Sequence, residues 1–202
     1  MRYLRHHLCY LNKRAVPEIN CSPENLNLFK HWLGCGYPLI MTRQPPDIPA
    51  QQIQLAIPYF QPEQARKIRA SFILSRSAIS RVSELPALRE LFPDLNYEIK
   101  VYGSYCWQYL TKEPYVQAES DLDLLVDYRD QSFLDLKSLY AQLQSQFSQQ
   151  RIDGEIRFAG LGDCSWRELL QLSGESLLFK SINKLRLLKR DNLYALFPSL
   201  LN

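Results

Sequence analysis

The alternation of hydrophobic and polar residues predicts strands at several places in the chain. Residues 3–11 alternate weakly, and residues 97–102 and 151–158 alternate clearly. Residues 121–127 place aspartates between leucines and predict a further strand, with Leu122 and Leu124 turned toward a core. Because side chains two apart in a strand share a face, these segments indicate sheets with one apolar and one polar face.

Helical periodicity and capping residues predict helices between these strands. Ser132 with Asp135 three residues later forms a capping-box pattern, and Ser165 with Glu168 repeats it. Pro62 is expected at the first position of a helix, where its missing N–H costs nothing. The predicted helices cover residues 26–33, 62–75, part of 79–92 with a break near Pro86, 105–111, the segments after Ser132 and Ser165, and a basic amphipathic segment at 175–190.

The order of these elements predicts an α/β or α+β protein. The second half runs strand, short helix, strand, helix, strand, helix, helix, with its acidic residues on the strands. Pro86 and Pro93 mark the expected boundary. We therefore expect a smaller α+β domain at residues 1–88 and a second domain at residues 89–202.

Composition narrows the class of protein. The chain has 202 residues, of which 46% are hydrophobic and 22% charged, so it is globular rather than disordered, collagen-like or a coiled-coil rod. The net charge of +3 is too small to indicate nucleic-acid binding. No stretch approaches the roughly 20 apolar residues of a membrane helix, and no apolar signal segment follows the basic start. The expected location is cytoplasmic, with no membrane partner.

The five cysteines are scattered, without a Cys-x-x-Cys pair. This usage predicts reduced thiols. A zinc site built from Cys21, His31 and Cys35 is disfavoured, because structural zinc sites need four ligands, usually in two close pairs.

Paired acids carry the candidate chemistry. Asp121 and Asp123 should share one face of a strand, where two carboxylates repel each other unless a cation joins them. Asp153 and Glu155 repeat the pattern on the next strand. Magnesium favours carboxylates together with substrate phosphates, and two such ions suit in-line displacement at phosphorus. Manganese could replace it. An alternative interpretation makes Asp153-Gly154 a hairpin turn.

Gly103-Ser104 follows one predicted strand and precedes a short helix. Glycine lets the backbone approach a phosphate closely, and the serine hydroxyl and first helical N–H groups can bind its oxygens. Motifs of other enzyme classes are missing from the sequence: a phosphate loop, a nucleophile elbow, a His-Glu-x-x-His zinc motif and a dinucleotide fingerprint.

The order strand, Gly-Ser, helix, Asp-x-Asp strand resembles the nucleotidyltransferase fold of the polymerase-beta type, a mixed sheet with flanking helices. A finer resemblance rests on the blocks Tyr102–Thr111, Tyr115 and Ser120–Leu125, with further matches at Arg151–Glu155, Ser165–Leu169, the segment around Lys180, Arg5–Leu8 and Pro38–Arg43. In these blocks the chain resembles the phosphoribosyl-dephospho-CoA transferases of malonate decarboxylase, also called holo-acyl-carrier-protein synthases. Lys112 departs from the family pattern, since a glycine is expected there.

The resemblance implies a reaction. A serine of the apo acyl-carrier subunit of malonate decarboxylase would attack the α-phosphorus of triphosphoribosyl-dephospho-CoA, and pyrophosphate would leave. The resemblance implies metal binding by Asp121 and Asp123, with Asp153 or Glu155 as a third acid and the choice between them left open. It implies triphosphate binding by Gly103 and Ser104. Lys180 and Lys184, four apart on the last predicted helix, would neutralise the pyrophosphate.

Other interpretations remain beside this one. Trp107 is expected in the core rather than stacked on adenine. Residues 1–94 hold 12 Lys+Arg against 7 Asp+Glu, net +5, and the helix expected around Arg66 and Arg69 could attract an acidic carrier. A nucleotidyltransferase with another acceptor (a small molecule, a tRNA or a protein) and a non-enzymatic binding module are the competing functions.

Overall fold

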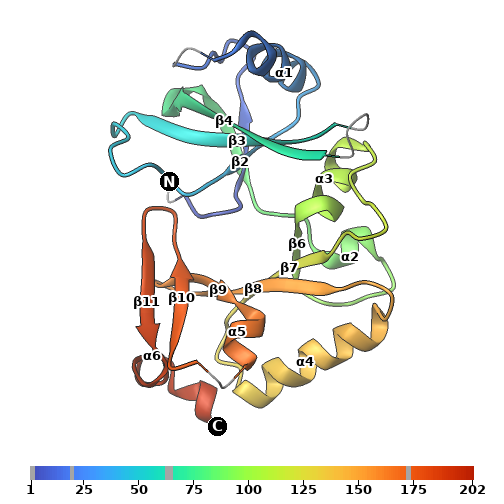
Figure 1. Ribbon diagram of the computed structural model, residues 1–202, viewed down its shortest axis with the longest axis vertical. Coiled ribbons are helices and arrows are strands. Elements are labelled where there is room, and N and C mark those ends of the chain that lie inside the picture. Colours follow the sequence, from blue (N-terminus) through green and yellow to red (C-terminus); the bar gives the residue numbers. More distant parts are fainter. Residues whose placement is uncertain (1–2, 19–20, 62–65, 172–173) are drawn as a thin grey trace.

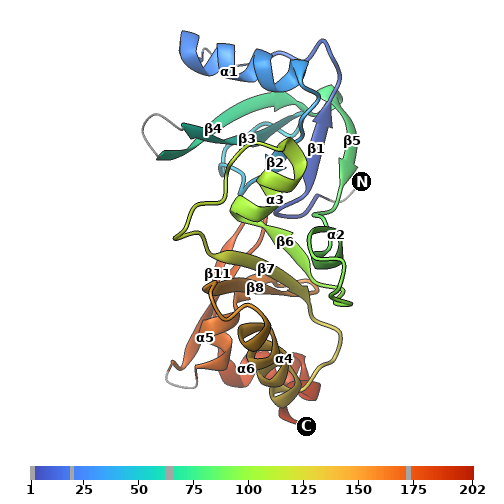
Figure 2. The same cartoon turned by 90° about the vertical axis from the view of Figure 1, so that its right-hand side faces the viewer.

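The computed structural model describes residues 3–18, 21–61, 66–171 and 174–202. Two sheets lie one above the other along its long axis (Figure 1), and the view turned by 90° shows the same stacking (Figure 2). The upper sheet comes from the N-terminal part of the chain and the lower one from the C-terminal part.

The N-terminal sheet is antiparallel and has the strand order β4-β3-β2-β1-β5. Helix α1 (Pro23–Gly34) lies over it, with the Ser22 side chain as its N-cap and with Phe29 packed on Phe72 at 5.0 Å between ring centroids. The strands are β1 (Leu8–Leu11), β2 (Leu39–Met41), β3 (Gln52–Gln61), β4 (Arg66–Ser75) and β5 (Ile79–Ser83), and the 3-10 turn η2 (Arg76–Ala78) joins the last two.

The C-terminal sheet is mixed and has the order β11-β10-β9-β8-β7-β6. Only β7 and β8 run parallel, because α4 carries the chain back between them. The strands are β6 (Lys100–Tyr102), β7 (Leu122–Asp127), β8 (Ile152–Phe158), β9 (Gly162–Ser165), β10 (Ser176–Lys180) and β11 (Leu185–Lys189). The helices are α2 (Leu88–Leu91), α3 (Gly103–Thr111), α4 (Phe133–Gln146), α5 (Trp166–Leu170), α6 (Arg190–Leu196) and the 3-10 turn η3 (Pro198–Leu201).

The two faces of the C-terminal sheet differ in polarity. Leu122, Leu124 and Ile156 are fully buried on the side that α4 and α5 cover (Figure 1). The alternate residues of the same strands, among them Asp123 and Glu155, lie on the face toward the N-terminal part of the chain, where Arg5 reaches Glu155. This polar face, enclosed between the two sheets, holds the candidate site.

Several predicted elements are confirmed. Strands expected at 121–127 and 151–158 are β7 and β8, and the Ser132–Asp135 capping box opens α4. The helices expected at 26–33 and 105–111 lie within α1 and α3. The Ser165 cap accepts the Glu168 N–H at the start of α5. The strands expected at 3–11 and 97–102 are shorter, as β1 and β6.

The helix predicted over 62–75 is wrong for residues 66–75, and residues 62–65 lie outside the described part. The segment is β4, paired with β3 from Gln61↔Arg66 to Gln52↔Ser75. Its apolar residues Ile68, Ala70, Phe72 and Leu74 recur every second position, which is the period of a strand. No basic helix therefore presents Arg66 and Arg69 to a carrier.

The helix predicted over 175–190 is also wrong. Strands β10 and β11 form a hairpin here, with Ser176 opposite Lys189 and Lys180 opposite Leu185. Lys180 ends a strand and Lys184 lies in the turn, so they do not share a helix face. The expectation for 79–92 is right in part, since β5 and the four-residue α2 replace one broken helix.

The remaining structural expectations concern single residues. None of the five cysteines forms a disulfide bond, in agreement with the predicted reduced thiols. Trp107 is 3% exposed and packs against Trp32 at 5.8 Å between ring centroids, which confirms its place in the core. Among the described residues, no helix has the length and apolar composition needed to cross a bilayer.

Candidate functional site

Asp123 and Asp153 lie side by side on the polar face. The parallel pairing of β7 and β8 puts their Cα atoms in register, and Tyr102 of β6 is the partner of Asp123 on its other side. Neighbouring strands are about 4.8 Å apart, so the two carboxylates occupy adjacent positions. β8 runs unbroken through Asp153 and Gly154, which excludes the hairpin turn.

Gly103 brings the two sequence motifs together. It has a φ of +66° and starts α3 directly after Tyr102. A Cβ atom at Gly103 would lie 1.8 Å from Oδ2 of Asp123, so the carboxylate packs against the glycine backbone. Ser104 is buried in the first turn of α3, at the helix end where the N–H groups carry partial positive charge. The arrangement places an acid beside the N-terminal end of a helix.

Asp121 lies one residue before β7 and binds Arg151. The Arg151 Nε atom is 2.6 Å from Oδ1 of Asp121, and a second contact joins Nη2 to Oδ2. The pKa of Arg151 is raised by the hydrogen bond to Asp121 and further by the charges of Asp153 and Asp123. All three aspartates therefore act on one exposed guanidinium.

Glu155 occupies a different environment from Asp153, although the two share a strand face. It is 6% exposed. Its Oε2 is 3.1 Å from Nη1 of Arg5 and 3.0 Å from Nε2 of His6, while its Oε1 is 3.1 Å from Nζ of Lys180. Burial alone would raise the pKa of Glu155, but the His6 hydrogen bond and the Arg5 and Lys180 charges lower it overall. Glu155 is thus an ionised group whose oxygens are already bound within the protein.

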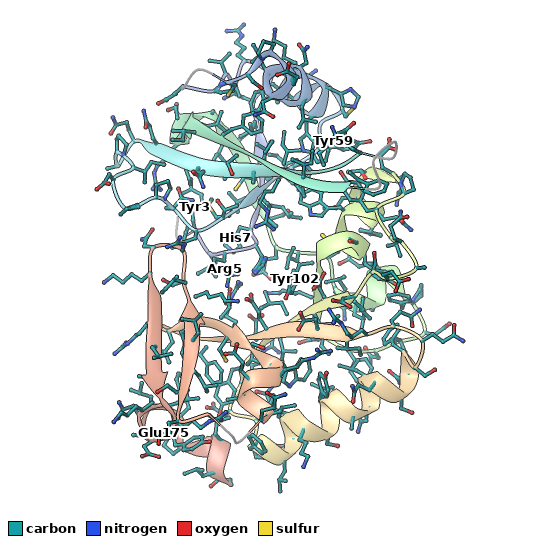
Figure 3. The ribbon with its side chains drawn as sticks, viewed as in Figure 1. Tyr3, Arg5, His7, Tyr59, Tyr102 and Glu175 are labelled. Carbon is teal, nitrogen blue, oxygen red and sulfur yellow. The ribbon has the colours of Figure 1, made fainter. Side chains whose placement is uncertain are left out.

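A second acid extends this network. Asp163 of β9 is 3.0 Å from Arg5 Nη1 and 2.6 Å from Arg157 Nε, and Arg157 also donates to the Arg5 carbonyl at 2.8 Å. Figure 3 shows Arg5 and Tyr102 between the two sheets. The His6 ring packs against Tyr102 in a tilted arrangement, with 4.6 Å between ring centroids, and His6 has a left-handed φ of +66°. The N-terminal segment is therefore built into the polar face of the other sheet.

Two groups of residues were candidates for a hard divalent cation, and among the described residues the ligand atoms of Asp121, Asp123 and Asp153 do not all lie within 4.8 Å of one another. Asp121, Asp123 and Asp153 offer only oxygen, the donor that magnesium prefers, at a partly exposed position. His6, Glu155 and Asp163 lie within reach of a common ion among the described residues. Arg5, however, donates to both of those acids and already supplies the positive charge.

The structure adds residues that sequence reasoning missed. Arg5, His6 and Asp163 carry the network around Glu155, and Tyr102 borders Asp123. The Arg5–Leu8 block was the available signal for the first two, but no role follows from it without the contacts across the sheets. Lys180 reaches Glu155, whereas Lys184 lies in the exposed turn after it.

Comparisons with known proteins show the family of the chain. The family model described as the phosphoribosyl-dephospho-CoA transferase MdcG C-terminal domain matches residues 71–191, and the corresponding N-terminal domain model matches residues 4–84. No solved structure gives a significant match.

Curated relatives named phosphoribosyl-dephospho-CoA transferase match almost the whole chain. One from Bradyrhizobium diazoefficiens is 29% identical over 92% of this chain and 90% of its own length. Another from Xanthomonas axonopodis pv. citri is 28% identical over 96% of this chain and 97% of its own. The chain therefore belongs to the phosphoribosyl-dephospho-CoA transferase family.

Proposed function

We propose that the protein transfers phosphoribosyl-dephospho-CoA from triphosphoribosyl-dephospho-CoA to a serine of the apo acyl-carrier subunit of malonate decarboxylase, with release of pyrophosphate. The observation that carries the proposal is the contact of Asp123 with Gly103 at the start of α3, beside Asp153. A phosphate-binding helix end and paired acids then meet at one point, as a nucleotidyltransferase-type reaction requires.

Asp121, Asp123 and Asp153 are the proposed ligands of two magnesium ions, which would neutralise the triphosphate when bound. Manganese would serve the same donor set. Asp153 is a better third ligand than Glu155, because Arg5, His6 and Lys180 already bind the Glu155 carboxylate. We assign Glu155 a positioning role, since its bonds link the N-terminal segment and β10 to β8.

The chain's own groups would bind the donor and move one proton. The first N–H groups of α3 and the Ser104 hydroxyl hold the triphosphate. The carrier serine oxygen forms a bond to the α-phosphorus as the bond to pyrophosphate breaks. Asp153 Oδ1 accepts the Gly154 N–H at 2.9 Å, and we propose Oδ2 as the acceptor of the serine proton. Lys180 and Lys184 remain proposed phosphate contacts.

Intact-mass measurement of the carrier tests this function. The full chain, the triphosphate donor, magnesium and the apo carrier should give a carrier heavier by one prosthetic group. Asp123→Asn should abolish the mass shift while its circular dichroism stays native, because the amide loses the charge but keeps the shape. The control Asp94→Asn changes an exposed aspartate outside the site and should transfer normally. A normal rate in Asp123→Asn would refute the assignment, and labelling of another acceptor in place of the carrier would favour a different nucleotidyltransferase.

A further inference from the structure

A cavity of about 690 Å³ opens beside the candidate site, between the two parts of the chain. Its walls come from the N-terminal segment around Tyr3, from Arg76 of η2, from the turn between β8 and β9, and from the turn after β10. Among the described residues that line it, Gly103, Asp123 and Asp153 do not occur. The cavity is therefore separate from the paired aspartates.

Positive charge dominates this cavity. Five cationic side chains line it, against the two acids Asp127 and Asp163. Lys100 already binds Asp127 at 2.7 Å, and Arg5 and Arg157 share Asp163. The five cations are Arg5, Arg76, Arg157, Lys180 and Lys184.

Two of these cations are available to a ligand. Within the described residues, neither Arg76 nor Lys184 has an acidic partner within 4.0 Å. Arg76 donates to the Gln52 carbonyl at 3.0 Å, and its guanidinium lies 5.3 Å from the centre of the Tyr3 ring. The Lys184 backbone is held by Ser181 in the turn, and the residue is exposed. The N-terminal part of the chain thus supplies one cation and the β10–β11 turn the other.

The remaining wall is apolar. Tyr128, Phe158, Leu161 and Ile182 contribute to the lining, and Tyr128 stacks on Phe158 at 4.6 Å. Pockets for small molecules commonly enclose about 300–1,000 Å³ and combine such apolar walls with a few charged groups. The expected ligand is an anion that carries an extended, partly apolar tail.

We propose that this cavity binds the diphosphate and pantetheine arm of the dephospho-CoA portion of the donor. The inference rests on the proposed function. That donor has two anionic groups, a triphosphate on the added ribose and a diphosphate that carries pantetheine. The start of α3 serves the first, so the second needs its own cations. Lys180 and Arg5 both line the cavity and contact Glu155, and they connect the two places.

Calorimetric titration of the full chain with 3′-dephospho-CoA tests the cavity. Lys184→Ala with Arg76→Ala should weaken binding at least about tenfold, the usual scale for the loss of charge-assisted hydrogen bonds. Lys184→Glu alone changes an exposed side chain and should weaken binding without a change in melting temperature. Lys137→Ala, an exposed position on α4, is the matched control and should bind as the wild type does.

Binding of fragments of the ligand distinguishes the contribution of the diphosphate from that of the pantetheine arm. ADP and inorganic pyrophosphate should bind more weakly than 3′-dephospho-CoA and lose affinity in the Lys184 variants. Equal affinity of pyrophosphate and 3′-dephospho-CoA would overturn the role of the pantetheine arm. Unchanged 3′-dephospho-CoA binding in the double variant would overturn the site, and so would an absence of binding to the wild type.

The experiments give different results when the cavity assignment is wrong and when the proposed function is wrong. Asp123→Asn should bind 3′-dephospho-CoA as the wild type does, because Asp123 does not line the cavity. If the wild type binds this ligand through Lys184 but transfers nothing to the carrier, the proposed function is wrong and the cavity assignment stands. If the carrier is modified at equal donor KM in wild type and double variant, the cavity assignment is wrong.

Discussion

Replacement of Gly103 by alanine tests the contact on which the site depends. The residue has a φ of +66°, a conformation that costs a residue with a Cβ about 1–2 kcal/mol. The added Cβ would also lie 1.8 Å from Asp123 Oδ2 and 2.7 Å from its Cγ. Ordinary contact begins at 3.4 Å, so the carboxylate must retreat by well over an ångström.

That retreat separates Asp123 from the position it shares with Asp153. A displacement of about 1 Å at a reacting centre can lower a rate by roughly 100-fold. We therefore expect Gly103→Ala to lose at least about 100-fold in carrier modification, measured as the initial rate of the mass shift. Urea unfolding should show a smaller effect, a decrease of about 1–2 kcal/mol in the free energy of unfolding, because the side chain of Asp123 can move aside.

Gly36→Ala is the matched control. Gly36 has a φ of +73°, close to that of Gly103, but a Cβ there meets no atom within 4 Å. The free energy of unfolding of Gly36→Ala should therefore fall by a similar amount, about 1–2 kcal/mol, while its transfer rate stays that of the wild type. If Gly103→Ala and Gly36→Ala transfer at rates within a factor of about two, the collision with Asp123 has no catalytic consequence and the reasoning fails.

Three further predictions concern other residues. Lys112 is the C-cap of α3 and has a left-handed φ of +64°, a conformation that glycine adopts more easily. Lys112→Gly should therefore raise the free energy of unfolding in urea by about 1 kcal/mol, and a lower free energy of unfolding would contradict this. Burial lowers the pKa of His6 below the ordinary 6.5, so the unfolded chain binds more protons and stability falls as pH drops below that value. His6→Asn should show a smaller fall between pH 7.5 and pH 5, and an equal fall would exclude His6 as the cause. Arg151→Ala should change the melting temperature little, since surface pairs contribute about 0–1 kcal/mol, and should lower the magnesium concentration for half-maximal transfer. A higher magnesium requirement in this variant would contradict the idea that Arg151 competes with magnesium for Asp121.

The local part of the site could be predicted from the sequence. Gly103-Ser104 at the start of a helix and Asp121 and Asp123 around a strand depend on neighbours a few residues away. Strand periodicity and capping choose those conformations directly. The capping partners of Ser132 and Ser165 lie three residues ahead, so the starts of α4 and α5 could also be predicted from the sequence.

The errors came from segments in which two periods compete. For the segment that forms β4, the helix prediction gave Pro62, which precedes the strand, more weight than the alternation of Ile68, Ala70, Phe72 and Leu74. Pairing with the ten-residue β3 along the whole length of β4 decides in favour of the strand, because it gives partners to the β4 backbone groups that face β3. The β10–β11 hairpin is a similar case, since its two strands pair with each other over five residues each.

The sequence by itself determined which residue types stand beside the Gly103-Ser104 turn and which strand faces carry acids. Only the tertiary structure decided which side chains those acids contact. Arg5 and Glu155 are 150 residues apart, and their contact forms because the N-terminal segment lies on the polar face of the C-terminal sheet. That contact distinguishes the internally bound Glu155 from the partly exposed Asp153, two acids that share a strand face. The physical reason is that burial and charge neighbours set the state of a carboxylate, and neither can be read from positions along the chain.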